Sequence, residues 1–143
     1  MALYRLSRTG SDQAATRLAE RENRADLLAG ADLSGESDAL ARLLVELAQR
    51  GTVDETTKLA QSMLDALKGE LELVRLNPLR RANFRVLKAP DIPSLLIEIG
   101  FLDSAVDRKR LVDPRWRRRA ATVIAQGVAD WTQVASPGFL TPR

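Results

Sequence analysis

One carboxylate, Glu98, stands inside the apolar run Leu95–Ile99, which Gly100 closes. A short apolar run bounded by glycine predicts a buried strand. Burying a carboxylate costs free energy unless a partner compensates it, so this position constrains the fold. In an open α/β sheet, ligands bind beyond the carboxyl ends of the strands. Glu98 is therefore either a candidate general acid or base, or a rim carboxylate paired with an arginine.

Composition narrows the possible chemistry. The chain has 143 residues, with 45% apolar and 29% charged side chains, which is typical of one globular domain. It contains no cysteine and no histidine. Disulfides, a thiolate nucleophile, a serine–histidine pair and a histidine-based zinc site are therefore excluded within this chain.

Charge is unevenly distributed along the sequence. Lys and Arg number 22 against 19 Asp and Glu, and the basic excess lies in the second half. The basic clusters are Arg80-Arg81-Arg85-Lys88, Arg108-Lys109-Arg110 and Arg115-Arg117-Arg118-Arg119. They predict either a polyanion-binding surface or solvated helix faces paired with Asp107 and Asp113. Trp116 lies among these arginines, but it falls on the apolar face of the last expected helix and is interpreted as a core residue rather than a platform for stacking on bases, so we expect no nucleic-acid partner.

Membrane and export signals are also not expected. No stretch reaches the roughly 18 apolar residues of a membrane span, and residues 1–10 lack the hydrophobic region of a signal peptide.

Periodicity and turn residues predict three strands and five helices. The expected strands are Ala2–Leu6, Phe84–Leu87 and Leu95–Ile99. The expected helices run from Ser11 or Asp12 to about Ala29, from Leu40 to Gly51, from Thr52 or Asp54 to Gly69, from Val106 to Val112, and from Asp113-Pro114 to Trp131. We expect a polar break at residues 34–38, a turn at Asn77-Pro78 and a loose tail at residues 136–143.

A second unusual carboxylate, Glu22, falls on the apolar stripe of the first expected helix, close to Leu18, Ala19 and Ala25. Either the helix is shallowly buried and Glu22 pairs with a neighbouring arginine, or Glu22 faces a cationic site beneath the helix.

Long motifs in the chain resemble a known family. The segment Val86–Leu102, VLKAPDIPSLLIEIGFL, is similar to the signature near the end of the zinc-dependent N-acetylmuramoyl-L-alanine amidases of the amidase_3 family. Asp113-Pro114 and the helix that follows resemble that family's ending. The segments Leu18–Leu28 and Leu40–Gln49 resemble the helical insert of its cell-separation branch. The resemblance covers residues 2 to about 132, in the family's order.

The resemblance implies a reaction. These enzymes cleave the amide between N-acetylmuramic acid and L-alanine in peptidoglycan. A zinc ion held by His, Glu and His polarises the carbonyl and acidifies a water molecule, and a glutamate takes the proton of that water. That glutamate corresponds to Glu98.

The resemblance also implies regulation. In the cell-separation branch the helical insert covers the active site, and a glutamate from its first helix, corresponding to Glu22, occupies the zinc. A partner protein that displaces the insert would activate the enzyme. Such an amidase works in the periplasm or cell envelope.

The zinc ligands of the family lie before the strand that Ala2–Leu6 resembles. We therefore expect the C-terminal part of a three-layer α/β zinc hydrolase, rich in helix. Residues 10–52 would form the regulatory insert, residues 53–135 the core and residues 136–143 the tail. We expect no metal ligands in this chain and no activity from it alone. The alternative is a non-enzymatic helical interaction module that uses its basic second half.

Overall fold

The strand β1 (Ala2–Leu6) lies at the centre of a three-stranded sheet in the computed structural model, which describes residues 1–28, 39–74 and 76–135. It pairs in parallel with β2 (Leu79–Ala82) and antiparallel with β3 (Leu96–Glu98). Because successive side chains of a strand point to opposite faces, Tyr4 and Leu3 enter different hydrophobic clusters.

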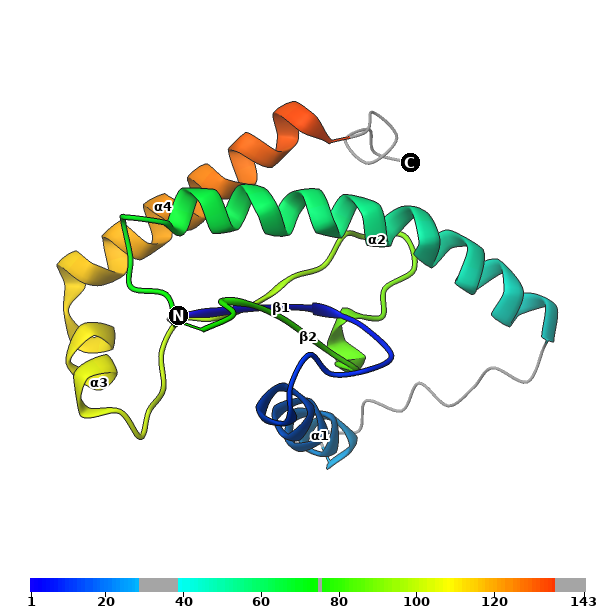
Figure 1. Cartoon of the computed structure of the whole chain (residues 1–143), viewed down its shortest axis with the longest axis horizontal. Helices are drawn as coiled ribbons and strands as arrows, with labels where there is room; N and C mark the ends of the chain where they lie inside the picture. The colour runs from blue at the N-terminus through cyan, green and yellow to red at the C-terminus, as the bar shows by residue number, and fades with distance from the viewer. Residues whose placement is uncertain (29–38, 75, 136–143) are drawn as a thin grey trace.

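Helices cover both faces of this sheet (Figure 1). Helix α1 (Gln13–Leu28) packs on the face of Tyr4, through Ala15 and Ala19. Helices α2 (Ala39–Leu67) and α4 (Pro114–Val134) lie together over the opposite face, and α3 (Ala105–Val112) connects β3 to α4. The expected α/β class, with helices dominating, is confirmed.

Capping residues fix where two of the helices begin. The Asp12 carboxylate accepts a hydrogen bond from the Ala15 amide at 2.8 Å, so Asp12 rather than Ser11 caps α1. Asp113 accepts from the Arg115 amide at 2.9 Å, and Pro114 follows it as the first residue of α4. The helix start predicted at Asp113-Pro114 is confirmed.

Helices α2 and α4 approach each other closely at Gly127. A Cβ atom at this position would lie 3.0 Å from the Met63 Cα and 2.9 Å from its sulfur. Ala120 and Val123 lie on the same buried face of α4, as the sequence predicts. The absence of a side chain at Gly127 therefore permits the packing of α2 on α4.

The predicted break at Gly51 is wrong. Helix α2 continues through this glycine from Ala39 to Leu67. Just beyond it, the buried Thr52 hydroxyl donates to the Pro90 carbonyl, and Thr56 Oγ1 accepts from the Ser94 amide at 3.3 Å. These tertiary bonds hold α2 against residues 90–94, which outweighs the weak helix propensity of one glycine.

The strand predicted at Phe84–Leu87 is also wrong. Residues Arg85–Leu87 form a 3₁₀ helix, η1, and the strand β2 precedes it. The Asn23 side chain of α1 accepts from the Arg85 amide at 2.8 Å and donates to the Asn83 carbonyl at 2.7 Å. These two bonds take up backbone groups that a strand would use for pairing.

The other predicted strands and the short helix agree with the structure. Strand β1 has the predicted bounds, whereas β3 is shorter than Leu95–Ile99 and α3 begins one residue before Val106. The predicted end of the first helix near Ala29, the polar break at 34–38 and the tail at 136–143 lie outside the described residues.

Candidate active site

Glu98 ends strand β3, and its side chain is half-buried. The pairing of β1 with β3 places Ala2 opposite Glu98 and Tyr4 opposite Leu96, so Tyr4 and Glu98 are diagonal neighbours on one face. The Tyr4 hydroxyl donates to Glu98 Oε2 at 3.1 Å. The hydrogen-bond partner of this carboxylate is thus a phenol rather than the arginine that a rim carboxylate would use.

The surroundings of Glu98 shift its protonation. Burial raises the pKa of the Glu98 carboxyl above its usual value, while the Tyr4 hydrogen bond and the charges of Arg21 and Arg80 oppose that rise. Burial, with a contribution from the Glu98 charge, raises the pKa of Tyr4 to about 12. Tyr4 therefore stays protonated and remains a donor near neutral pH.

Glu98 and Tyr4 line a cavity of about 800 Å³. The cavity lies between α1, strand β2 and the loop after β3, and the loop contributes Phe101 and Asp103. Its full lining is Tyr4, Ala14, Arg17, Leu18, Arg21, Arg80, Glu98, Gly100, Phe101, Leu102 and Asp103. A half-buried carboxylate with a raised pKa inside such a cavity can exchange a proton with a bound molecule.

Glu22 lies beside this cavity rather than in its lining. Its Oε1 atom accepts from Arg21 Nε at 3.0 Å and forms an ion pair with Arg21 Nη2 at 3.0 Å. The Glu22 side chain is 45% exposed. The pairing with a neighbouring arginine that the pattern allowed is therefore present, and Arg21 itself lines the cavity.

The residues of this chain do not fit a zinc site. The sequence has no histidine or cysteine. Among the residues that the structure describes, no group of three or more Asp and Glu side chains is arranged to hold a metal ion. Glu98 and Glu22 alone do not supply a zinc coordination shell.

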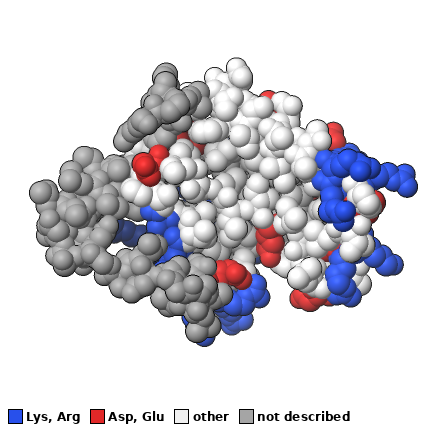
Figure 2. Space-filling model, turned by 180° about the vertical axis from the view of Figure 1, so that it is seen from behind, with Lys and Arg blue, Asp and Glu red and all other residues white. Residues whose placement is uncertain are grey.

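Basic side chains gather at the end of the molecule formed by α3 and the start of α4, seen at the right in Figure 2. Arg110 pairs with Glu72 at 2.8 Å and with Asp107 at 3.5 Å, and Arg119 pairs with Glu70 at 2.9 Å. Arg110 and Arg119 are thus engaged in ion pairs on this surface. Within the described ranges, the structure has no helix suited in length and apolarity to crossing a membrane.

Sequence reasoning missed three of the groups around Glu98. Tyr4 was expected only as an apolar strand residue, Arg80 only as part of a basic cluster, and Arg17 not at all. Pairing register and the position of α1 bring them together. The alternation in β1 puts Tyr4 on the face of Ala2, but only the register with β3 shows that this is also the face of Glu98.

The family model described as N-acetylmuramoyl-L-alanine amidase, Amidase_3, matches residues 8–130. The match begins two residues after β1 and continues almost to the end of α4, and it includes Glu98, Glu22 and the whole cavity lining except Tyr4. The chain belongs to this family of amidases.

Two bacterial relatives support this membership. N-acetylmuramoyl-L-alanine amidase AmiA of Escherichia coli (strain K12) is 33% identical over 131 residues, covering 91% of this chain and 45% of the relative. N-acetylmuramoyl-L-alanine amidase AmiC of Neisseria meningitidis serogroup B is 35% identical over 127 residues, covering 88% of this chain and 30% of the relative. The chain thus spans less than half of the length of each.

Proposed function

We propose that the protein of which this chain forms a part hydrolyses the amide between N-acetylmuramic acid and the L-alanine of the peptidoglycan stem peptide. The observation that carries the proposal is the position of Glu98. The carboxylate that the family resemblance matches to a general base lies at the end of a strand and lines a cavity. Membership of the amidase family favours this reaction over the interaction-module alternative.

In the proposed reaction, Glu98 accepts a proton as water attacks the scissile carbonyl and then gives a proton to the leaving amine of L-alanine. Both transfers are efficient when the pKa of the carboxyl lies closer to neutrality than that of an exposed glutamate. The burial that raises the pKa of Glu98 supports this role.

Zinc, which the family generally uses, would have to be held by residues that this chain does not contain. We therefore expect the isolated chain to bind no zinc tightly and to have no amidase activity. Metal analysis after dialysis against buffered zinc tests the first point. A stoichiometric ion on the isolated chain would contradict it.

We further propose that residues 10–52 form a regulatory insert and that Glu22 blocks the zinc until an activator protein displaces the insert. Helix α1 supports this proposal because it contributes Arg17, Leu18 and Arg21 to the cavity lining. Moving α1 away would therefore open the cavity beside Glu98. To reach a metal in the cavity, Glu22 would first have to release Arg21.

The Glu22 proposal is tested with Glu22→Ala in the complete gene product. We expect activity without an activator to rise about tenfold, which corresponds to a loss of ~1.4 kcal/mol from the closed state. Glu20→Ala is the matched control, because Glu20 is an exposed carboxylate on the same helix. Equal activities of the two variants would contradict the blocking role.

We propose that the complete protein acts in the periplasm or cell envelope, because that is where peptidoglycan lies. The bond that is cut can be tested by digesting purified peptidoglycan with the complete gene product and analysing the fragments by mass spectrometry. We expect free stem peptides with an L-alanine amino terminus and glycan strands with intact lactyl groups. Fragments cut within the glycan or within the peptide would contradict the proposal.

A further inference from the structure

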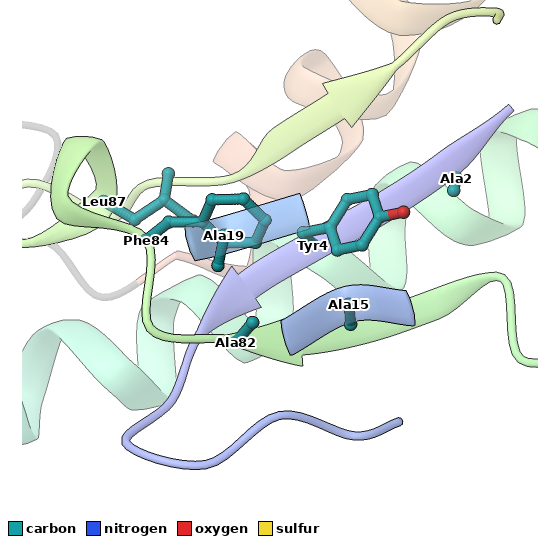
Figure 3. Close-up of a cluster of buried hydrophobic side chains, with 7 residues drawn as sticks. All are labelled: Ala2, Tyr4, Ala15, Ala19, Ala82, Phe84 and Leu87. Carbon is teal, nitrogen blue, oxygen red and sulfur yellow. The ribbon is translucent and has the colours of Figure 1, made fainter. Parts of the chain in front are cut away.

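The side chain of Tyr4 is held in one position by its packing. It is 2% exposed and belongs to the cluster formed by β1, β2 and α1, shown in Figure 3. Its ring meets the ring of Phe84 edge-on, with centroids 5.4 Å apart and an interplanar angle of 71°. Ala15 and Ala19 of α1 and Ala82 of β2 belong to the same cluster, and their small side chains leave room for the two rings.

The hydroxyl group is the functional end of this buried ring. In Figure 3 it points away from Phe84 and toward the side of Ala2, the residue that the strand register places opposite Glu98. The hydrogen bond of 3.1 Å to Glu98 Oε2 joins a donor on β1 to an acceptor on β3. Because both groups stand on adjacent strands of one sheet, their relative position is fixed by backbone pairing.

We propose that Tyr4 is a positioning residue for Glu98, whose phenol holds Oε2 and so turns Oε1 toward the cavity to accept the proton. The inference rests on the proposed role of Glu98 as a general base. A carboxylate that swings freely loses the alignment on which proton transfer depends. A hydrogen bond from a donor on the adjacent strand supplies that alignment, and the pairing of β1 with β3 that positions the donor does not involve α1, the helix that the proposed activation displaces.

Charged groups also face Glu98 from each element around it. Arg17 and Arg21 come from α1, Arg80 from β2 and Asp103 from the loop after β3, and the amino group of Met1 precedes β1. Of these, Arg21, Arg80 and the amino group favour the ionised carboxylate through their charge. Tyr4 differs because it donates directly to a carboxylate oxygen and stays protonated at neutral pH.

The direction of the effect follows from the hydrogen bond. The Tyr4 hydroxyl stabilises the ionised form and therefore lowers the pKa of Glu98 from the value that burial alone would give. Removing the hydroxyl should raise the pKa of Glu98, and a stronger donor should lower it.

This trend can be measured without any enzymatic activity. Tyr4 is the one tyrosine of the sequence, so growth on 3-fluorotyrosine alters only this residue in the isolated chain. Carbon-13 NMR of labelled glutamate, with the Glu98 signal identified by its loss in Glu98→Gln, gives the titration of that carboxyl. We expect Glu98 to titrate at highest pH in Tyr4→Phe, at intermediate pH with tyrosine and at lowest pH with fluorotyrosine.

Activity of the complete gene product gives the second measurement. In Tyr4→Phe we expect kcat to fall about tenfold, KM to stay within about twofold, and the acid limb of the pH–rate profile to move to higher pH. Phe84→Leu is the matched control, since it disturbs the same cluster but leaves the hydroxyl of Tyr4. It should lower the melting temperature without moving the acid limb.

The possible outcomes distinguish a failure of the positioning role of Tyr4 from a failure of the proposed function of Glu98. Identical Glu98 titrations in the phenylalanine, tyrosine and fluorotyrosine proteins would overturn the role of Tyr4. An acid limb moved as far by Phe84→Leu as by Tyr4→Phe would overturn it too. Full activity of Glu98→Gln would instead refute the general base itself, whatever the titrations show. The fluorotyrosine protein keeps the ring and the fold, so the comparison survives if Tyr4→Phe does not fold.

Discussion

The two faces of the sheet differ in the side chains that cover them. On the face of α2 and α4, the cluster consists of Met1, Leu3, Met63, Leu67 and Val123. On the face of α1, alanines surround two aromatic rings, and a cavity with arginines and two carboxylates opens beside them. The first cluster therefore buries only aliphatic side chains, whereas the second face also carries the groups able to do chemistry.

The largest loss of stability should come from the face of α2 and α4. Leu3 is fully buried there, and Leu3→Ala should lower the free energy of unfolding by about 3 kcal/mol through lost burial and a cavity. Leu6→Ala makes the same chemical change on the same strand at a partly buried position on the α1 face. Its cost should be about 1 kcal/mol. Urea unfolding of both variants measures this difference. Equal losses of unfolding free energy would contradict the contrast between the two faces.

A smaller loss is expected where α2 and α4 touch. Gly127→Ala places a Cβ atom 3.0 Å from the Met63 backbone, which cannot move aside as a flexible side chain would. The net cost should be about 1 kcal/mol, because overpacking outweighs the better helix propensity of alanine. On the exposed side of the same helix, Ala129→Gly should also destabilise, by about 1 kcal/mol, through propensity alone. Stabilisation by Gly127→Ala would contradict the close packing.

On the α1 face, replacing Glu98 should stabilise the protein rather than destabilise it. This change in stability should be the smallest of the three. Burial raises the pKa of the Glu98 carboxyl in the folded state. The favourable contribution of Glu98 to the free energy of unfolding is therefore fully present when the pH is below the pKa that this carboxyl has in the unfolded chain. That contribution disappears as the pH rises through the folded pKa. Glu98→Gln should therefore raise the melting temperature at pH 8, on the order of 2 °C, and leave it unchanged at pH 4. Equal shifts at both pH values would contradict this account.

Local patterns predicted the elements whose signals lie within a few residues. The apolar residues within Ala2–Leu6 gave the bounds of β1, and the Asp113-Pro114 pair gave the start of α4. In contrast, β2 has the sequence Leu-Arg-Arg-Ala, which carries no strand pattern of its own. It becomes a strand because β1 pairs with it across more than 70 positions of sequence. Such long-range pairing overrides local propensity.

The same limit applies to the candidate site. Glu98 and Glu22 were recognisable because a carboxylate among apolar residues is unusual at the level of sequence. The hydroxyl of Tyr4 and the guanidinium of Arg80 were not, because both belong to residues that are ordinary where they stand. Only the strand order β2-β1-β3 brings Tyr4, Arg80 and Glu98 to one cavity.

The central claim is that Glu98 transfers the proton in amide hydrolysis, and one measurement tests it most directly. Glu98→Gln in the complete gene product keeps the shape of the side chain and an acceptor for the Tyr4 hydroxyl, but it removes the base. Release of stem peptides from purified peptidoglycan should fall about 10³-fold, while the variant stays folded. Peptide release at the wild-type rate would contradict the account.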